Sequence, residues 1–442
     1  MKIQSVFTSN PQAKKCYLSL LGDLVCILPS NYRTVLIDYS HSSCIMESIL
    51  KWEVNTMAEA KKALPILFIV MFLVMIGFGI IIPVLPFYAE ALGASPAELG
   101  WLMAVYSLMQ LLFAPMWGRV SDRVGRKPVI MIGIFGLALS FFLMGISSSL
   151  WMLFVARIVG GFLSAANMPT VMAYAADITS EEDRGKGMGV VGAATGLGFI
   201  FGPAVGGVFS NISLNMPFYV AGTSSVLTFF LVFLFLKESL AAEARGRHQA
   251  ENPPLRRLLS GPLSILFFLQ LFISLSLAGL EATFAYYAAE KAGLGAIQLG
   301  YIFMIMGLAS AIVQGGLVGR LTKKHGEGTV IQAGIIISAL GFALILLVDS
   351  FLTAAIFLTV FGVGNGVIRP SVSALLTRQS AEGYGSTTGW LSSFDSLGRI
   401  IGPPLGGWLF AVMIGLPYLS GIVLSIFAFI LYRFYRGQTV KA

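Results

Sequence analysis

Apolar residues in this chain gather into long runs that short polar connectors separate. From residue 63 onward each run has about 20 residues, the length with which an α-helix crosses a bilayer. Transmembrane β-strands would alternate polar and apolar residues over about 10 positions, which these runs do not do. The pattern predicts an all-α membrane protein with twelve transmembrane helices. The predicted spans are residues 63–88, 98–117, 129–147, 150–174, 187–209, 217–236, 262–288, 297–318, 329–348, 351–376, 386–410 and 413–434.

The composition supports a membrane protein. Of the 442 residues, 56% are hydrophobic and 11% are charged, whereas soluble domains carry about 25% charged residues. The formal net charge of +8 would suit a nucleic-acid partner only if the basic residues gathered on one surface. They are spread over many short connectors, so we expect contact with the lipid bilayer and none with nucleic acid.

The distribution of lysine and arginine predicts the topology. Of 29 basic residues, five precede Met57, three lie well inside predicted spans, and Lys291 lies in one connector. The remaining 20, with Arg433 at the end of the last span among them, all lie on the side opposite Lys291. Basic residues accumulate on the cytoplasmic side of membrane proteins. We therefore predict a multi-pass plasma-membrane protein with both termini in the cytoplasm.

Residues 1–56 differ from the rest, because they show neither a helical nor a strand period. Asp23 interrupts their most apolar stretch and no small-residue cleavage site follows, which argues against a signal peptide. Met57 opens the segment MAEAKKALPILFIV, which has the form of a membrane protein's own start. We interpret residues 1–56 as a disordered or loosely packed N-terminal extension, produced by an upstream start codon. All three cysteines lie in it, so the spans hold no thiolate metal site.

The chain repeats itself after about 200 residues. Gly118-Arg119 follows the second span and Gly319-Arg320 follows the eighth, 201 residues later, and Pro169 and Pro370 are separated by the same interval. The glycine–proline pattern of the fifth span recurs 200 residues later in the eleventh. Its members are Gly198, Gly202, Pro203, Gly206 and Gly207, followed by Gly398, Gly402, Pro403, Gly406 and Gly407. Because six is an even number of spans, the copies form parallel halves, as in two-lobed secondary transporters.

The repeat divides the chain into an N-terminal six-helix half at residues 57–236 and a C-terminal six-helix half with a short cytoplasmic tail at residues 261–442. Residues 237–260 join them as a cytoplasmic linker, in which four arginines flank Pro253-Pro254. A solvated linker is a simpler interpretation of this segment than a regulatory element.

Five motifs occur in order at corresponding span positions, and together they resemble the drug:proton antiporters of the major facilitator superfamily, in particular the bacterial multidrug efflux pumps. The motifs are IGFGIIIPVLP in the first span, GRVSDRVGRK after the second, RIVGG in the fourth, GLGFIFGPAVGG in the fifth and LEATFAYYAAEK in the seventh. The resemblance covers Met57 to about Arg436. It implies the twelve-helix major facilitator fold and proton-driven efflux of small hydrophobic or cationic drugs by alternating access.

We expect a monomer that binds small molecules and protons and needs no cofactor. No enzymatic activity is expected, because the spans contain no set of nucleophile, base and metal. The sequence has no GxxxxGK[ST] loop, which excludes ATP as the energy source. The GxGxxG match at residues 187–192 follows no strand and leads into a membrane helix, so dinucleotide binding is also excluded.

The resemblance assigns a gating role to the motif after the second span. Gly118, Asp122 and Arg126 would belong to a charge cluster that locks the cytoplasmic side shut in the outward-facing state, because an ion pair that forms in one conformer biases an equilibrium between two. Glycines at this turn would let two helices approach closely. The second copy has Lys323 where the first has Asp122, so its latch should be weaker.

In the fifth span Gly198, Gly202 and Gly206 recur every four residues, so they line one helical face against which a neighbouring helix can pack. The resemblance identifies this pattern, with Pro203 and Gly207, as the antiporter signature. It also implies that Pro203 bends the helix that closes the central cavity.

Charged residues within a span cost roughly 2.5 to 3.5 kcal/mol each on insertion scales, and they usually face a cavity where they act. Away from the span ends, these residues are Arg157, Glu281, Arg369, Asp395 and Arg399. The resemblance implies a proton-coupling role for Arg157 beside the cavity. Hydrogen bonds to backbone carbonyls of a neighbouring helix would explain Arg157 and Arg369 almost as well. Asp395 and Arg399 lie four residues apart, so an ion pair within one helix would explain both.

Glu281 has no basic residue three or four positions away on its own helix. An unpaired carboxyl group in the bilayer is expected to hold a proton near neutral pH, because burial favours its neutral form. The resemblance also points to Glu281 as the proton carrier, at which an inward proton displaces an outward-bound substrate. Several members of the family that the chain resembles place a second acid just before the Arg-Pro pair of the tenth span. Residues 365–368 contain none, and Asp395 is the candidate replacement. A protonated glutamate that only packs is the alternative for Glu281.

The candidates for the substrate cavity are Tyr106, Phe284, Tyr287, Phe303, Arg369 and Phe394. Aromatic faces bind flat or cationic molecules, although helix packing explains each ring better when it is taken alone. Two rival functions stay open on the sequence: a dedicated efflux carrier for one metabolite, sugar or lipid, and a non-transporting membrane sensor.

Overall fold

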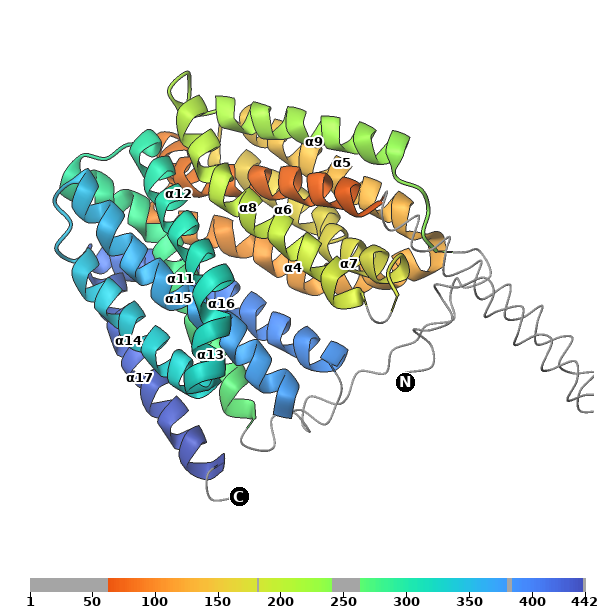
Figure 1. Ribbon diagram of the computed structural model, residues 1–442. Helices are drawn as coiled ribbons and strands as arrows, with labels where there is room; N and C mark the ends of the chain where they lie inside the picture. The colour runs from red at the N-terminus through yellow and green to blue at the C-terminus, as the bar shows by residue number, and fades with distance from the viewer. Residues whose placement is uncertain (1–62, 181–182, 241–262, 380–383, 440–442) are drawn as a thin grey trace, which may run out of the picture. The chain divides into compact units, whose positions relative to one another are not determined.

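The structure, a computed structural model, describes residues 63–180, 183–240, 263–379 and 384–439. Within these ranges every regular element is a helix and no strand occurs (Figure 1). The all-α fold class is therefore confirmed. The interpretation of residues 1–56 and most of the predicted linker fall outside the described residues.

Each of the twelve predicted spans corresponds to a helix or to a run of consecutive helices. The helices are Ala63–Ala91, α4 (Pro96–Val124), α5 (Arg126–Gly145), α6 (Leu150–Ser164), α7 (Asn167–Asp177), α8 (Arg184–Ser210), α9 (Met216–Phe235), α11 (Ser264–Ala292), α12 (Ala296–Ile312), the π-helix η3 (Val313–Val318), α13 (Gly319–His325), α14 (Glu327–Ile345), α15 (Phe351–Gln379), α16 (Tyr384–Val412) and α17 (Leu416–Thr439). Among the described residues, 11 spans are long and apolar enough to cross a membrane. The remaining span is α16, which has 29 residues and carries Asp395 and Arg399.

Local sequence sets several helix ends. The Oγ of Ser95 accepts a hydrogen bond from the Glu98 backbone N–H at 3.3 Å, while the Glu98 carboxylate accepts one from the Ser95 N–H at 2.8 Å. This capping box starts α4. Gly125 follows α4 with φ 119° and Gly293 follows α11 with φ 63°, backbone conformations that favour glycine.

The fourth predicted span is two helices, α6 and α7, rather than one. Pro169 has no N–H to donate to the carbonyl of Ala165, and its ring would clash with that carbonyl in a continuous helix. At the break, the Trp117 Nε1–H donates to the Phe162 carbonyl at 2.8 Å. Pro370, the repeat counterpart of Pro169, lies inside the continuous α15, so proline alone does not decide where a span breaks.

The two halves use the same helix pairs. In the N-terminal half α5 packs against α6 and α9, and in the C-terminal half α14 packs against α15 and α17. Between the halves, α4 packs against α16 and α8 packs against α12 (Figure 1). Because the repeat relates α4 to α12 and α8 to α16, these two contacts are equivalent seams between parallel copies.

Both seams are tight at the same end of the bundle. A Cβ atom added to Gly100 would lie 2.4 Å from the Pro403 carbonyl oxygen, and one added to Gly300 would lie 2.5 Å from the Pro203 carbonyl oxygen. Only glycine fits where backbones approach this closely. We call this the closed end; its connectors are residues 92–95, 146–149, 211–215, 293–295, 346–350 and 413–415.

At the opposite end, no described glycine of α4, α8, α12 or α16 approaches the backbone of the other half. We call it the open end; its described connectors include residue 125, residues 178–180, residue 183 and residue 326. A Cβ atom added to any of the following glycines would meet no atom within 4 Å: Gly118, Gly185, Gly189, Gly192, Gly196, Gly315, Gly316 and Gly319. The described glycine contacts between the halves therefore lie at the closed end, apart from Gly307, which approaches Ile200 farther along the α8–α12 seam.

Candidate functional site

Two acids and two arginines of the C-terminal half meet between three helices. Arg399 of α16 lies with its Nε 3.3 Å from Asp395 Oδ2 and its Nη1 3.8 Å from Glu281 Oε2 on α11. Arg369 of α15 lies with its Nη2 3.6 Å from Asp395 Oδ2. The predicted Asp395–Arg399 ion pair is confirmed. The prediction that Glu281 is unpaired is wrong, because its partner comes from another helix.

Asp395 is held more firmly than Glu281. Its second carboxylate oxygen accepts hydrogen bonds from the Ser274 hydroxyl and, at 3.0 Å, from Gln270 Nε2. Both donors lie on α11, one helical turn apart. Among the described residues, the polar partner of the Glu281 carboxylate is Arg399. Both acidic side chains are only 13% exposed. The Asp395 carboxylate is held at both of its oxygens, whereas the Glu281 carboxylate has one cation at 3.8 Å.

The N-terminal half supplies a different polar cluster. Arg157 of α6 is buried, donates from Nε to the Leu102 carbonyl of α4 at 3.4 Å, and lies 4.5 Å from the centre of the Tyr106 ring. The carbonyl interpretation of this arginine is therefore confirmed. The Tyr106 and Ser164 hydroxyl oxygens are 2.6 Å apart, and Gln110 donates to both. Arg369 differs from Arg157: its ion pair is with Asp395, and its side chain is 56% exposed.

The glycine pattern of α8 performs the predicted packing. Cβ atoms added to Gly198, Gly202 and Gly206 would lie 2.5 to 2.6 Å from atoms of the helix Ala63–Ala91. Gly207 faces α12 instead, where its added Cβ would lie 2.9 Å from the Ala296 carbonyl oxygen. One helix therefore contacts its own half and the opposite half through different glycines, while Pro203 lies within it.

The counterpart pattern in α16 repeats this arrangement. Gly398, Gly402 and Gly406 approach α11, and Gly407 approaches Pro96 and Ala97 of α4. The sequence predicted a packing face for the glycines of α8, and for α16 it showed only that the same pattern recurs. The contacts of Gly207 and Gly407 with the opposite half were not predicted. Each follows directly after another glycine, and adjacent residues of a helix face different neighbours, so the glycine pair was the available signal.

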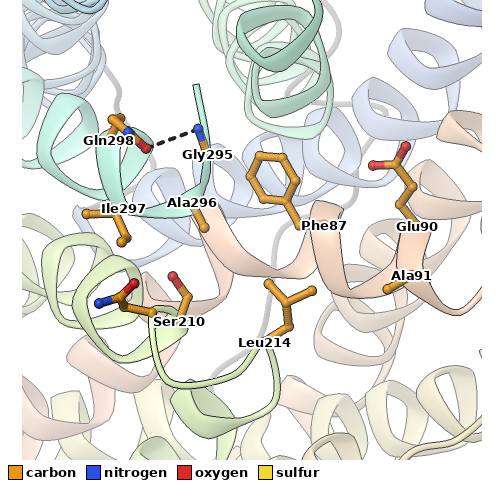
Figure 2. A pocket seen from close by; sticks show the side chains of 10 residues that line it. Phe87, Glu90, Ala91, Ser210, Leu214, Gly295, Ala296, Ile297 and Gln298 are labelled. Atoms are coloured by element: carbon orange, nitrogen blue, oxygen red, sulfur yellow. Dashed lines mark hydrogen bonds between the residues drawn. The ribbon is translucent and has the colours of Figure 1, made fainter. Parts of the chain in front are cut away.

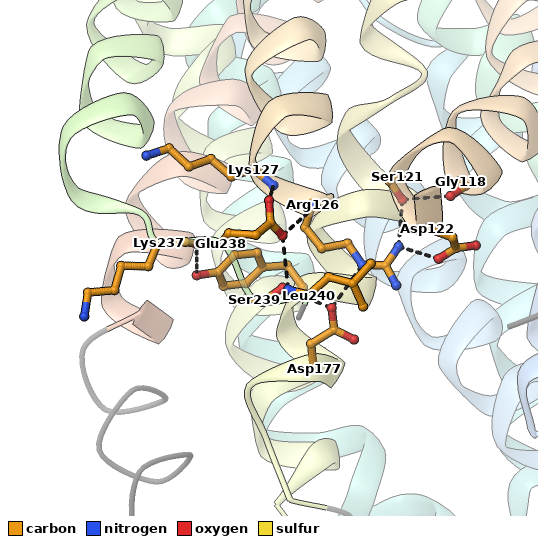
Figure 3. Close-up of polar contacts among 11 residues, drawn as sticks. Gly118, Ser121, Asp122, Arg126, Lys127, Asp177, Lys237, Glu238, Ser239 and Leu240 are labelled. Carbon is orange, nitrogen blue, oxygen red and sulfur yellow. Dashed lines mark hydrogen bonds and ion pairs between the residues drawn. The ribbon is translucent and has the colours of Figure 1, made fainter. Parts of the chain in front are cut away.

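The predicted gating residues form a cluster within the N-terminal half at the open end (Figure 3). Arg126 Nη1 lies 2.6 Å from Asp122 Oδ1, and Arg126 Nε lies 3.0 Å from Asp177 Oδ2 of α7. Arg126 Nη1 also donates to the Ser121 hydroxyl, which donates to the Gly118 carbonyl at 2.8 Å. Asp122 and Arg126 are thus paired at the open end. Close glycine contacts between the halves, at Gly100 and Gly300, lie at the closed end.

The predicted close approach at Gly118 is wrong for this conformation, because no atom lies within 4 Å of an added Cβ there. The close approach is at Gly125, where an added Cβ would lie 2.5 Å from Glu238 Oε2. Glu238 was missed by the sequence analysis. Its carboxylate accepts the backbone N–H groups of Arg126 at 2.8 Å and Lys127 at 3.1 Å, which satisfies free donors at the start of α5.

The candidate cavity aromatics lie in the packed core of this conformation. Phe284 and Phe303 meet edge to face with ring centres 5.9 Å apart. Tyr287 donates to the Leu346 carbonyl at 3.1 Å and packs on Tyr418, and Phe394 stacks on Phe267. Helix packing describes these rings here; substrate contact stays a prediction.

Parallel six-helix repeats, charged clusters inside each half and seams that close at one end define a membrane transporter of the two-lobed class. The sequence matches the Major Facilitator Superfamily over residues 67–324 and 266–442. This chain belongs to that superfamily. Its members are transporters, so the expected class of protein is confirmed, as is a multi-pass membrane protein.

The relatives include multidrug resistance proteins. Multidrug resistance protein 2 of Bacillus subtilis is 32% identical over 375 residues, which cover 83% of this chain and 94% of the relative. The quinolone resistance protein NorA of Staphylococcus aureus is 28% identical over 365 residues, with 83% and 94% covered.

Solved structures show the same fold. A bacterial homologue of the human lysosomal transporter Spinster, described as inward-facing and occupied, superposes with a TM-score of 0.71 at 15% identity and covers 86% of this chain and 97% of its own. The nucleoside transporter NupG superposes with a TM-score of 0.70 at 15% identity, with 85% and 98% covered.

Proposed function

We propose that this protein exports small hydrophobic or cationic drugs across the plasma membrane in exchange for protons. The observation that carries the proposal is the charge network of the C-terminal half, in which a buried glutamate shares its arginine with a second acid. The multidrug and quinolone resistance relatives support drug efflux as the direction and substrate class.

The open end faces the cytoplasm in this proposal, and both termini lie there. The 20 basic residues predicted on one side support this orientation by the positive-inside rule. The conformation is then inward-facing, with both seams shut on the outer side. The protein works as a monomer, since the two halves of one chain supply both sides of each seam.

Glu281 is the proton carrier. In the unprotonated state its charge is balanced by Arg399, and in the protonated state Arg399 keeps Asp395 as its partner at 3.3 Å. The arginine therefore has a counter-charge in both states, which avoids the high cost of an unpaired buried charge. Asp395 contributes to proton coupling by holding Arg399, and Arg369 gives Asp395 a second cation.

The N-terminal half contributes Arg157 and Tyr106 beside the route of the substrate. The C-terminal half offers apolar surface to the substrate when the halves move, from the rings of Phe284, Phe303 and Phe394. The Tyr287 hydroxyl stays hydrogen-bonded to the Leu346 carbonyl. Asp122, Arg126 and Gly118 act at the cytoplasmic gate. Gly207 of α8 and Gly407 of α16 carry glycine contacts between the halves at the closed end.

Efflux of ethidium from cells tests the proposal. Cells that express the full chain should extrude ethidium, and an uncoupler that collapses the proton gradient should stop extrusion. Glu281→Gln should lower the efflux rate about tenfold or more, because a permanently neutral side chain cannot release a proton. Glu290→Gln is the matched control, since Glu290 is an exposed acid on the same helix.

Ethidium extrusion that persists unchanged with the uncoupler would remove the antiport proposal. Full activity of Glu281→Gln, at equal amounts of protein in the membrane, would remove the site assignment while leaving efflux intact. A chain that extrudes no ethidium or other cationic dye would instead be a carrier for a single metabolite or a sensor.

A further inference from the structure

A cavity of about 500 Å³ lies at the closed end, and Glu281 is not among the residues that line it. Its volume is that of a small-molecule pocket. The walls come from three helices: Phe87 and Glu90 at the end of the helix Ala63–Ala91, Ser210 at the end of α8, and Ile297 at the start of α12 (Figure 2).

The chemistry of the walls suits a cation with an apolar body. Glu90 is the charged residue of the lining, and Phe87 lies near it in Figure 2. Leu214 and Ile297 add aliphatic surface. A carboxylate beside an aromatic ring attracts an organic cation by charge and by the negative face of the ring.

We propose that this cavity binds a flat organic cation from the closed-end side and that its occupant holds the closed end shut. The assignment of this side to the outside of the cell, where exported cations accumulate, rests on the proposed function; the binding site itself does not. An exported cation would then slow its own exporter by binding at the exit.

The cavity exists only while the halves are together at this end. Ser210 and Leu214 belong to the N-terminal half, whereas Ala296 and Ile297 belong to the C-terminal half. A Cβ atom added to Gly207 would lie 2.9 Å from the Ala296 carbonyl oxygen and 3.1 Å from the Ile297 Cα. Opening the closed end separates these walls. A ligand that binds one conformer alone shifts the equilibrium toward it.

The repeat shows that the hollow is specific to one seam. Phe410 occupies the position 200 residues after Ser210. Its ring packs on Tyr286 of α11, with ring centres 6.0 Å apart. Helix α11 is the counterpart of the helix Ala63–Ala91, so an aromatic ring lies in the second seam where a hydroxymethyl group borders the cavity in the first.

Propidium, a flat aromatic dication that does not cross membranes, is a suitable probe. The full chain, purified in lipid nanodiscs, should bind propidium saturably, with a rise in dye fluorescence. Glu90→Gln should weaken binding about tenfold, because the cation loses its counter-charge. Ser210→Phe, which places the residue of the other seam in the cavity, should also weaken binding about tenfold by filling the space. Glu290→Gln, an exposed acid of α11 outside the lining, should bind as the wild type does.

A variant remote from the cavity tests the link to conformation. Gly100 lies on the other seam, and an added side chain there would collide with Pro403. Gly100→Leu should force the closed end apart and weaken propidium binding about tenfold, although Gly100 lines no part of the cavity. Unchanged binding by this variant would overturn the proposed conformational effect.

The site assignment is overturned if the wild type binds no propidium saturably, or if Glu90→Gln and Ser210→Phe bind as tightly as the wild type. It is also overturned if Glu281→Gln abolishes binding while Glu90→Gln does not, since the dye would then occupy the central site. These measurements need no proton gradient and no transport. A failure of ethidium efflux therefore leaves this site standing, and a failure of propidium binding leaves the efflux proposal standing.

Discussion

Asp395 and Glu281 share one arginine but are held very differently. Asp395 accepts hydrogen bonds from Ser274 and Gln270 and faces two arginines. Glu281 faces Arg399 at 3.8 Å. In the proposed antiport mechanism, Asp395 keeps Arg399 in place while Glu281 exchanges its proton. That mechanism requires a lasting ion pair and a titrating group around a single guanidinium.

Asp395→Asn should destabilise the protein, because it leaves Arg399 with one distant counter-charge. A broken buried ion pair costs about 3–5 kcal/mol, and Arg399 is 32% exposed, so we expect a loss of about 2 kcal/mol after solvent screening. Thermal unfolding in lipid nanodiscs measures it. The double variant Asp395→Asn/Arg399→Gln should recover much of the lost stability, since it removes the uncompensated cation as well. No recovery would mean that Asp395 acts through its hydrogen bonds with α11 rather than through charge.

The sequence identified every residue of this network that carries a charge, but not its partners. The pair of Asp395 and Arg399 lies within one helix, where a spacing of four residues determines the contact. The contact of Glu281 with Arg399 joins two helices, and no spacing along the chain encodes it. Gln270 could have been singled out, because it is a polar residue in an apolar span and therefore needs a polar partner, here Asp395.

At the scale of helices, the glycine face of α8 sets how closely it approaches its neighbour. Gly202→Ala should destabilise the protein by about 1–3 kcal/mol, the usual cost of overpacking. Its added Cβ would lie 2.6 Å from the Gly79 Cα and 2.7 Å from the Ile76 carbonyl oxygen, and these backbone atoms cannot turn away. Thermal unfolding in lipid nanodiscs is the measurement.

Gly196→Ala is the matched control for this prediction. Gly196 lies on the same helix, and its added Cβ meets no atom within 4 Å. Alanine also favours helix over glycine by about 1 kcal/mol, so this variant should be as stable as the wild type or more so. Equal destabilisation by both substitutions would show that glycine is needed for helix flexibility rather than for close packing.

The positions of the helices followed from the sequence more completely than their interruptions did. Hydropathy gave all twelve spans, because each must cover the same apolar thickness. The break between Ser164 and Asn167 was not predicted. A proline does not determine such a break, because the counterpart proline at position 370 lies in a continuous helix. What distinguishes the two is a tertiary contact, the indole of Trp117 that donates to the Phe162 carbonyl.

Across the whole molecule the repeat preserves an ion pair while it reverses the charges. Arg126 pairs with Asp177 at 3.0 Å in the N-terminal half. Glu327 pairs with Arg378 at 3.4 Å in the C-terminal half, and each residue lies 201 positions after its counterpart. Both pairs join helices within one half. Such pairs tie each half together at its open end, which favours movement of the halves as rigid units.

If the halves move as rigid units, widening the closed end must bring the open ends together. Gly100→Leu widens the closed end, because its side chain would collide with the backbone of Pro403 and Pro404. Spin labels at Lys186 of α8 and Lys324 of α13, both exposed and on opposite halves, report the separation of the open ends by pulsed electron spin resonance. In a background without the native cysteines, the variant should shift the distance distribution to shorter values. Gly196→Leu, whose added Cβ would lie in open space, should leave the distribution unchanged. An unshifted distribution in Gly100→Leu would mean that the seams open without coupling the two ends, and alternating access would then require bending within the halves.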